Sequence, residues 1–296
     1  MELRQLTSFV TIAKLGSTTQ AANVLGYAQS SITTQMQLLE GELGTKLFER
    51  LGRSLNLSSD GLKLLPYAQQ ILHLTHEAQQ VMAVGETVKG TLTIGAVESL
   101  CVKRLPELVK EFRQRYPAVE LVLRLGNCID FPQLLTDNVI DVAFSLGQRN
   151  ITSYLISELN CEEPMVLLAA PGHPLVGKVA VYPQDFAGEP LILTEDTCPY
   201  RKVFEAILNE AGIQPYSVLE TGSLQAIKQF AMSGLGITLL PGIAVTEELA
   251  AGRLVKLPWG GPDFGMKTQV IYHKDKWLSP PIRALLDLAE EMLRKS

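Results

Sequence analysis

The sequence predicts an α/β protein that begins with a winged helix-turn-helix domain, continues through a long linker helix and ends in a two-lobed α/β domain. Three observations predict this order. Apolar residues recur with a helical period through most of the first 60 residues. One long helical pattern then runs to about Val88, and from Thr91 strand patterns alternate with helix patterns. The expected domains are 1–58, 59–90 and 91–296.

The composition is that of a globular protein. The chain of 296 residues is 46% hydrophobic and 19% charged, and no apolar run approaches the roughly 18 residues of a membrane span. Its N-terminal segment carries polar residues every few positions and is not a secretory signal, so we expect a cytoplasmic protein without membrane contact. The four cysteines are widely spaced and form no C-x-x-C pair, which indicates neither a disulfide framework nor a metal site. No cofactor is indicated.

The first 43 residues carry the pattern of three helices. A helix over about 2–14 ends near Gly16, and Ser17 caps a second helix that packs through alanines. A third helix is expected over 30–43, because its apolar residues are spaced by four, three and four: Ile32, Met36, Leu39 and Leu43. The link between the second and third helices is short, which predicts a helix-turn-helix.

The other face of the third helix is polar and carries short hydroxyl and amide side chains. Such groups reach phosphates and base edges. Leu55 and Leu57 then follow a turn with Arg50 and Arg53, which looks like a β-wing whose basic residues meet phosphates. The residues expected to contact DNA are Gln29, Ser30, Ser31, Thr33, Thr34, Gln37, Arg50 and Arg53.

The charge distribution does not by itself indicate DNA binding, so the case for DNA binding rests on the helix-turn-helix pattern rather than on an excess of positive charge. The chain carries a net charge of −5, and the first 60 residues hold five basic and five acidic side chains. These first 60 residues are therefore neutral, and the remainder of the chain carries the negative charge. We expect only modest non-specific attraction to nucleic acid.

Several short motifs of the N-terminal domain closely resemble LysR-type transcriptional regulators. They are Gly16-Ser17, Ala21-Ala22, Gln29-Ser30-Ser31-Ile32-Thr33, Leu39-Glu40, Leu43-Gly44, Leu47-Phe48-Glu49-Arg50, Leu57-Ser58 and Gly61. The resemblance implies a transcription factor whose paired heads bind double-stranded DNA at a pseudo-palindromic operator. It also implies a small-molecule effector and a homo-oligomer, either a dimer or a dimer of dimers, that is, a homotetramer.

The linker helix carries a heptad-like seam. Its members alternate at spacings of four and three: Leu64, Ala68, Ile71, Thr75, Ala78, Met82 and Gly85. Small residues in this seam suit a close dimer contact. The resemblance favours that interpretation, because the family pairs its DNA-binding heads through this helix. The alternative is a linker helix that packs on its own domain.

From Thr91 onward, strand and helix patterns alternate and restart near Met165, which predicts two α/β lobes with largely parallel sheets. The resemblance implies that the last elements return to the first lobe, as in a periplasmic solute-binding protein. The chain then crosses between lobes twice, near Cys161 and Lys267. The expected lobes are 91–161 with 268–296, and 162–267.

A ligand site is expected between the lobes, because open α/β sheets bind ligands beyond the carboxyl ends of their strands. Three segments with hydroxyls and helix starts follow predicted strands, and such groups suit an organic anion. The resemblance places an effector against Ser99 and 197–201. The loop at 127–129 is a weaker candidate for the rim of the site. The alternative is that these hydroxyls only cap helices. The expected contacts are Ser99, Leu100, Asn127, Cys128, Thr197, Cys198, Tyr200, Arg201, Thr221 and Gly222.

Three other functions are weighed against this interpretation. Catalysis is disfavoured, because no histidine lies in the three segments to activate a nucleophile. Redox sensing through Cys198, which sits at an expected helix start, stays open. A solute-binding module without DNA contact explains 91–296 but leaves the first ninety residues without a role.

Overall fold

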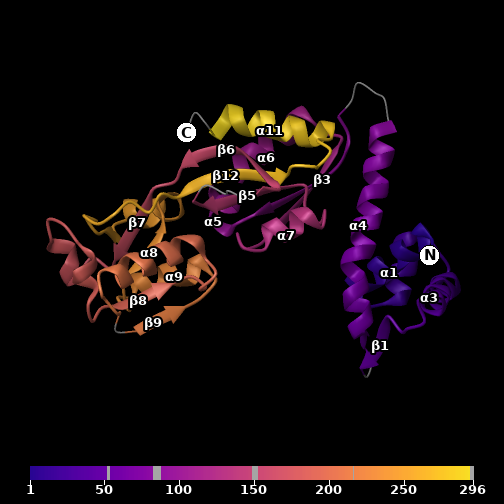
Figure 1. Ribbon diagram of the computed structural model, residues 1–296, viewed down its shortest axis with the longest axis horizontal. Coiled ribbons are helices and arrows are strands. Elements are labelled where there is room, and N and C mark those ends of the chain that lie inside the picture. The colour runs from indigo at the N-terminus through magenta and orange to yellow at the C-terminus, as the bar shows by residue number, and fades with distance from the viewer. Residues whose placement is uncertain (52–53, 83–87, 149–152, 216, 294–296) are drawn as a thin grey trace. The chain divides into compact units, whose positions relative to one another are not determined.

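The computed structural model describes residues 1–51, 54–82, 88–148, 153–215 and 217–293 (Figure 1). The chain divides into two compact units. The first holds helices α1 to α4 and a β-hairpin, and the second holds two β-sheets with their helices. In the described part of the chain, no helix is long and apolar enough to cross a membrane.

Three helices form the core of the first unit: α1 (Leu3–Leu15), α2 (Thr18–Leu25) and α3 (Gln29–Leu43). The Ser17 hydroxyl accepts a hydrogen bond from the backbone N–H of Gln20 at 3.3 Å and so caps α2. Gly44 ends α3 with a φ of 69°, a left-handed conformation that glycine adopts without strain. Ile32, Met36 and Leu39 of α3 are buried in one core with Phe9 and Ile12 of α1, so the predicted helical period is confirmed for these three residues. Leu43, the fourth residue of the predicted stripe, is 41% exposed at the last position of α3.

A two-stranded wing follows the helices. Strand β1 (Phe48–Leu51) pairs with β2 (Ser54–Leu57) in antiparallel register, with Phe48 opposite Leu57. Helix α4 (Ser59–Met82) begins directly after the wing. Gly61 lets α4 approach the chain before the wing, since a Cβ at this position would lie 2.1 Å from the carbonyl oxygen of Leu47.

Helix α4 uses the first part of the predicted seam inside its own unit. Ala68 is fully buried, and Leu64 and Ile71 pack against the same core as α1 to α3. Ala68 is therefore not free for a dimer contact, whereas Leu64 and Ile71 are only partly buried. The period of one helix does not reveal which side meets its own domain. The exposed apolar side chains of α4 lie elsewhere: Leu62 (61% exposed), Tyr67 (64%) and Leu74 (56%). The Met82 side chain and Gly85 lie outside the described residues.

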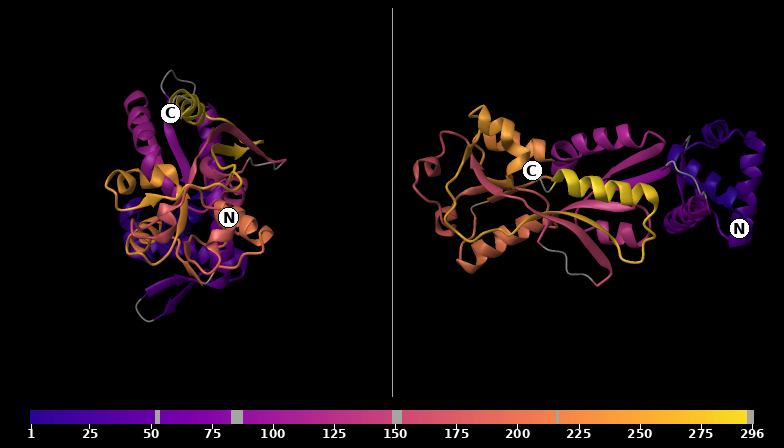
Figure 2. Two further views of the ribbon diagram at one scale, coloured as in Figure 1. Left: turned by 90° about the vertical axis from the view of Figure 1, so that its left-hand side faces the viewer. Right: turned by 90° about the horizontal axis from the view of Figure 1, so that it is seen from above.

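The first sheet of the second unit has five strands in the order β4-β3-β5-β12-β6 (Figure 1). The strands are β3 (Gly90–Ala96), β4 (Val119–Leu125), β5 (Val142–Gly147), β6 (Leu155–Glu162) and β12 (Lys267–His273). Strands β3, β4 and β5 run parallel, and β12 is antiparallel to both β5 and β6. Helices α6 (Leu105–Arg115) and α11 (Pro280–Leu293) lie side by side over one face (Figure 2), and α7 (Phe131–Thr136) packs on the other.

The second sheet combines two pairings. Strands β7 (Met165–Ala169), β10 (Thr238–Pro241) and β11 (Val255–Lys256) are antiparallel, whereas β8 (Pro190–Leu193) and β9 (Ser217–Glu220) are parallel. A bridge between Leu191 and Ile237 links the two groups. The prediction of largely parallel sheets is therefore wrong for this lobe. Its remaining elements are α8 (Pro199–Glu210), α9 (Leu224–Met232), α10 (Thr246–Ala250) and short 3-10 turns at Pro174–Gly177, Pro183–Phe186 and Gly242–Val245.

The chain passes between the two sheets at two adjacent places. The first passage lies between the ends of β6 and β7, and the second precedes β12. The backbone N–H of Glu163 donates to the carbonyl of Met266 at 2.9 Å, and the Thr268 hydroxyl donates to the buried Glu163 carboxylate at 2.9 Å. These two bonds tie the passages to each other. Helix α5 (Glu98–Lys103) follows β3 at the edge of the first sheet that faces the second.

Candidate functional site

Helix α3 presents a polar face to solvent. All six of its expected DNA-contact residues are exposed: Gln29, Ser30, Ser31, Thr33, Thr34 and Gln37. The hydroxyl of Thr33 donates to the carbonyl of Gln29, and that of Thr34 donates to the carbonyl of Ser30, both at 3.0 Å. Each threonine therefore keeps its oxygen lone pairs and its methyl group available, and these are the features that distinguish base edges in a major groove.

The start of α3 is open as well. Its N-cap residue is Ala28, which has no side chain to cap the first turn. Free backbone N–H groups at a helix start favour phosphate oxygens. Arg50 lies in β1 opposite Leu55, but its side chain and the whole of Arg53 lie outside the described residues.

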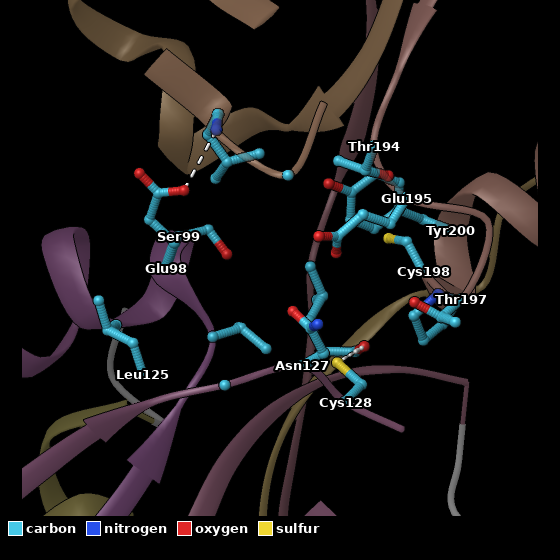
Figure 3. Close-up of a pocket in the computed structure, with 16 residues that line it drawn as sticks. Glu98, Ser99, Leu125, Asn127, Cys128, Thr194, Glu195, Thr197, Cys198 and Tyr200 are labelled. Carbon is cyan, nitrogen blue, oxygen red and sulfur yellow. Dashed lines mark hydrogen bonds between the residues drawn. The ribbon is translucent and has the colours of Figure 1, made fainter. Parts of the chain in front are cut away.

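A cavity of about 340 Å³ lies between the two sheets of the second unit (Figure 3). Its volume is at the lower end of the range for small-molecule sites, which is about 300–1,000 Å³. Four loops or helix starts line it, namely the start of α5, the loop after β4, the loop from β8 into α8 and the loop before α9, and Leu146 of β5 completes the lining. Each stretch follows a strand or opens a helix, so the predicted position at strand ends agrees with the geometry.

Seven of the expected effector contacts line this cavity, and three do not. The lining residues are Ser99, Asn127, Cys128, Thr197, Cys198, Tyr200 and Gly222. Leu100 is fully buried in the core that includes residues of α6 and α11, because the turn of α5 that places Ser99 at the cavity points the next side chain into this core. Thr221 lies one residue before Gly222 and does not line the cavity.

Arg201 also lies outside the lining, and its guanidinium points into the lobe. It is 8% exposed and donates to the carboxylates of Glu205 at 2.7 Å and Glu220 at 2.6 Å, as well as to the carbonyl of Thr194. Burial opposes its charge, but the bonds to Glu220 and Glu205 outweigh burial and raise the pKa of Arg201. The predicted contact of Arg201 with an effector is therefore replaced by a positioning role, in which it ties the β8–α8 loop to β9.

The cavity combines helix starts with buried polar groups. Helix α8 begins with Pro199, which has no N–H, and its N-cap residue Cys198 makes no capping hydrogen bond. The backbone N–H groups of the first turn of α8 are thus open to an acceptor. Ser99 is 5% exposed and brings a hydroxyl to the opposite wall.

Burial shifts the pKa values of two side chains in the cavity lining, Tyr200 and Cys128. It raises the pKa of Tyr200 well above its usual range, and the neighbouring Cys198 adds to this effect. Burial likewise raises the pKa of the Cys128 thiol, which donates a hydrogen bond to the carbonyl of Leu146 at 3.0 Å. Both groups are therefore neutral hydrogen-bonding groups near pH 7.

Sequence reasoning missed three polar residues of the lining: Glu98, Thr194 and Glu195. Their positions were readable, because Glu98 precedes Ser99 and the other two follow strand β8 directly. The sequence pattern does not single them out, because hydroxyls near helix starts indicate an anion site and carboxylates do not. Among the described residues, no group of three or more histidine, cysteine or acidic side chains could hold a metal ion.

The fold and these two sites define a winged-helix DNA-binding unit joined to a two-lobed ligand-binding domain. Comparison with known proteins gives the same division: residues 3–62 match the family "Bacterial regulatory helix-turn-helix protein, lysR family", and residues 85–294 match "LysR substrate binding domain". The chain belongs to the LysR family of transcriptional regulators, as its motifs implied. It is a DNA-binding transcriptional regulator with an effector-binding domain.

Individual relatives span the whole chain. The HTH-type transcriptional regulator YwqM of Bacillus subtilis is 42% identical over 296 residues, which cover 99% of this chain and 100% of the relative. The solved structure of HinK, a LysR family regulator from Pseudomonas aeruginosa, is 29% identical with a TM-score of 0.61 and covers 100% of this chain and 99% of HinK. A full-length OxyR variant from Pseudomonas aeruginosa shares the fold, with a TM-score of 0.73, 21% identity and coverage of 97% and 94%. A solute-binding module without DNA contact is therefore disfavoured.

Proposed function

We propose that this regulator senses a small organic molecule with an acidic group in the cavity between its two lobes, and that occupancy of the cavity changes how it binds its operator. The observation that carries this proposal is the meeting of four separate strand-end segments around one cavity of about 340 Å³. The hydroxyls of Ser99 and Thr197 and the open first turn of α8 are the groups that would hold the acid.

We further propose that α3 reads base edges through Gln29, Ser30, Ser31, Thr33, Thr34 and Gln37, and that Arg50 and Arg53 contact phosphates. The exposure of all six α3 side chains supports this assignment. The domains would be 1–58 for DNA binding, 59–90 for the linker and 91–296 for the effector, with a pseudo-palindromic operator and a cytoplasmic location. No catalytic role is proposed, since the lining carries no histidine to activate a nucleophile.

Thermal unfolding of the full chain tests the sensing site. A ligand at about a hundred times its dissociation constant stabilises the native state by about 2.7 kcal/mol, so an effector should raise the melting temperature visibly. The double variant Ser99→Ala with Thr197→Val should abolish this rise and leave operator binding without ligand intact. A ligand response that survives the double substitution would place the sensing site elsewhere.

We also propose that the chain forms a homo-oligomer through the exposed side of α4. Leu74 is 56% exposed, and Ala78 is exposed one helical turn further on. The double change Leu74→Glu and Ala78→Glu should separate the protomers and weaken operator binding, because the two heads would no longer bind as a pair. Light scattering measures the mass, and Val179→Glu, at a 98% exposed position of the second unit, is the control. An unchanged mass would exclude this side of α4 as an interface.

A further inference from the structure

Two carboxyl groups line the cavity, and no positive side chain accompanies them. Glu98 belongs to α5 in the first lobe, and Glu195 belongs to the loop after β8 in the second (Figure 3). Among the residues that the structure describes, no lysine or arginine lines the cavity. Arg201 does not offset them, since its guanidinium binds Glu205 and Glu220. The cavity is therefore acidic.

The two carboxylates differ in what they already bind. One oxygen of Glu98 accepts a hydrogen bond from the backbone N–H of Leu224, the first residue of α9, at 3.1 Å. The Glu195 carboxylate has neither a hydrogen bond nor an ion pair within the described part of the chain. It packs against Gly222, where a Cβ would lie 2.4 Å from its Oε1, so the glycine leaves the space that this carboxylate occupies.

A second polar group beside Glu195 also lacks a partner. The side chain of Thr194 is 7% exposed, and its hydroxyl makes no hydrogen bond. Its backbone carbonyl is occupied by Arg201. The hydroxyl faces that of Tyr200 without forming a hydrogen bond of normal geometry, and it opposes the rise in the pKa of Tyr200 that burial causes. A buried hydroxyl without a partner is unfavourable, so a ligand that supplies one is favoured at this wall.

We infer that the effector carries a protonated amine as well as an acidic group, and that the amine binds Glu195, with the Thr194 hydroxyl and the free oxygen of Glu98 as further acceptors. This inference rests on the proposed function, which supplies the acidic group. An ammonium group has three donors and no acceptor, which matches three oxygen acceptors. The cavity of about 340 Å³ then takes a small zwitterion of the amino-acid class.

The charge of the cavity also selects against simpler ligands. An acid without an amine would bring a like charge close to Glu98 and Glu195 with no cation to offset it. An amine without an acid would leave the first turn of α8 without an acceptor. A zwitterion satisfies both requirements, with its acid toward the start of α8 and Ser99 and its amine toward Glu195 and Glu98.

The test uses the full-length protein and matched sets of compounds. Thermal unfolding and calorimetry are measured with the common L-α-amino acids, with the 2-hydroxy acid of each carbon skeleton, and with the corresponding amine that lacks the carboxylate. At least one amino acid should raise the melting temperature, while its 2-hydroxy acid and its amine should not. If no amino acid binds, the inference is overturned.

The variant Glu195→Gln assigns the amine contact. It should weaken binding of that amino acid about ten- to a hundredfold, which is the range for a hydrogen bond between charged groups, and should improve binding of the 2-hydroxy acid relative to it. Melting without ligand should not fall, because the substituted carboxylate has no partner. Glu210→Gln, at an exposed position near the end of α8, is the matched control and should change nothing.

The outcomes separate the inference from the proposed function. A 2-hydroxy acid that binds as well as its amino acid, loses binding in the Ser99→Ala and Thr197→Val variant, and is indifferent to Glu195→Gln would overturn the inference alone. Binding of any compound that survives the Ser99→Ala and Thr197→Val variant would overturn the proposed site itself.

Discussion

The DNA-facing side of α3 and the effector cavity are built in opposite ways. The α3 face is one stretch of helix whose polar side chains all point to solvent, and only two of its hydroxyls bond to the helix itself. The cavity draws its lining from stretches that are far apart in the sequence, and Arg201 and Gly222 fix the spacing between two of them. A substitution on α3 should therefore act locally, whereas a substitution in the cavity wall should act through its neighbours.

The largest effect should come from Arg201, which lies outside the lining. Arg201→Met removes a guanidinium with three oxygen partners and should lower the free energy of unfolding by about 1–3 kcal/mol, since these groups lose their donor. Glu205 and Glu220 are 36% and 49% exposed, so water limits the cost. Operator binding should be unchanged. Thermal unfolding and gel shift measure the two effects.

The adjacent Lys202→Met is the control for this variant, because Lys202 is exposed on the same helix. It should leave the melting temperature within the error of the parent. Equal stability of the Arg201 and Lys202 variants would remove Arg201 from its positioning role, and the cavity wall would then be no more interdependent than the face of α3.

A second prediction concerns the local character of α3. Thr33→Ala removes an oxygen and a methyl group that face the major groove, and should relax base preference at one position by about 1–3 kcal/mol. The folding free energy should change little, because the side chain is exposed and bonds only to the carbonyl of Gln29. Binding to operators with each base pair varied in turn measures the effect.

The control for Thr33 is another threonine in the same local setting. Thr7 of α1 also donates to the carbonyl four residues earlier, Leu3, at 2.9 Å, but it is not on α3. Thr7→Ala should leave base preference unaltered. A Thr33→Ala protein that loses affinity equally for all sequences would show that this side chain contacts phosphate rather than a base.

The third prediction concerns whether the effects of two substitutions add, on α3 and at the cavity wall. Ser30 and Gln37 lie seven residues apart on α3, about 10 Å along the helix, so their alanine substitutions should add to within about 0.5 kcal/mol in operator binding. Arg201→Met and Glu220→Gln remove two ends of one ion pair and should not add: their coupling energy in unfolding should be about 0.5–1 kcal/mol, since Glu220 is half exposed. Additive effects at both sites would show that the residues of the cavity wall act as independently as those of α3.

The same contrast explains what the sequence could and could not predict. The apolar stripe of Ile32, Met36 and Leu39 follows from helical periodicity, so the opposite face of α3 follows as well. Ser99 and Thr197 were found because parallel strands bring their carboxyl ends together. The partner of Arg201 was not predictable, because Glu220 lies 19 residues away and becomes its partner only when β8 and β9 pair.

Two other features of the structure, the burial of Ala68 and the acidic lining of the cavity, were not predictable from the sequence for the same physical reason. The small seam residue Ala68 of α4 is buried against the unit's own core, and the period of one helix does not distinguish this packing from packing on a second copy. The acidic lining was missed because Glu98 and Glu195 become a pair of charges only when the two lobes face each other. Local pattern specifies a helix face, whereas the charge of a cavity depends on which loops meet.

The smallest effect is expected for a substitution of Cys198, which tests whether this residue senses oxidants. Cys198→Ser should change the free energy of unfolding by less than about 0.5 kcal/mol, because the side chain is partly exposed at the start of α8 and makes no capping hydrogen bond. All four cysteines are free thiols. Burial raises the pKa of Cys128, the other thiol of the cavity wall, so it stays protonated near pH 7 and is a poor partner for disulfide formation.

Treatment with hydrogen peroxide provides the measurement. Operator binding by the parent and by the Cys198→Ser protein should be the same before and after treatment, since Cys128, the other thiol of the cavity wall, stays protonated and does not convert an oxidised Cys198 into a disulfide. A peroxide-dependent change in the parent that the Cys198→Ser protein lacks would favour oxidation of this sulfur as the signal. In that case the cavity wall would respond through one side chain, as α3 does, and the cooperation of its four segments would serve only to shape the thiol's surroundings.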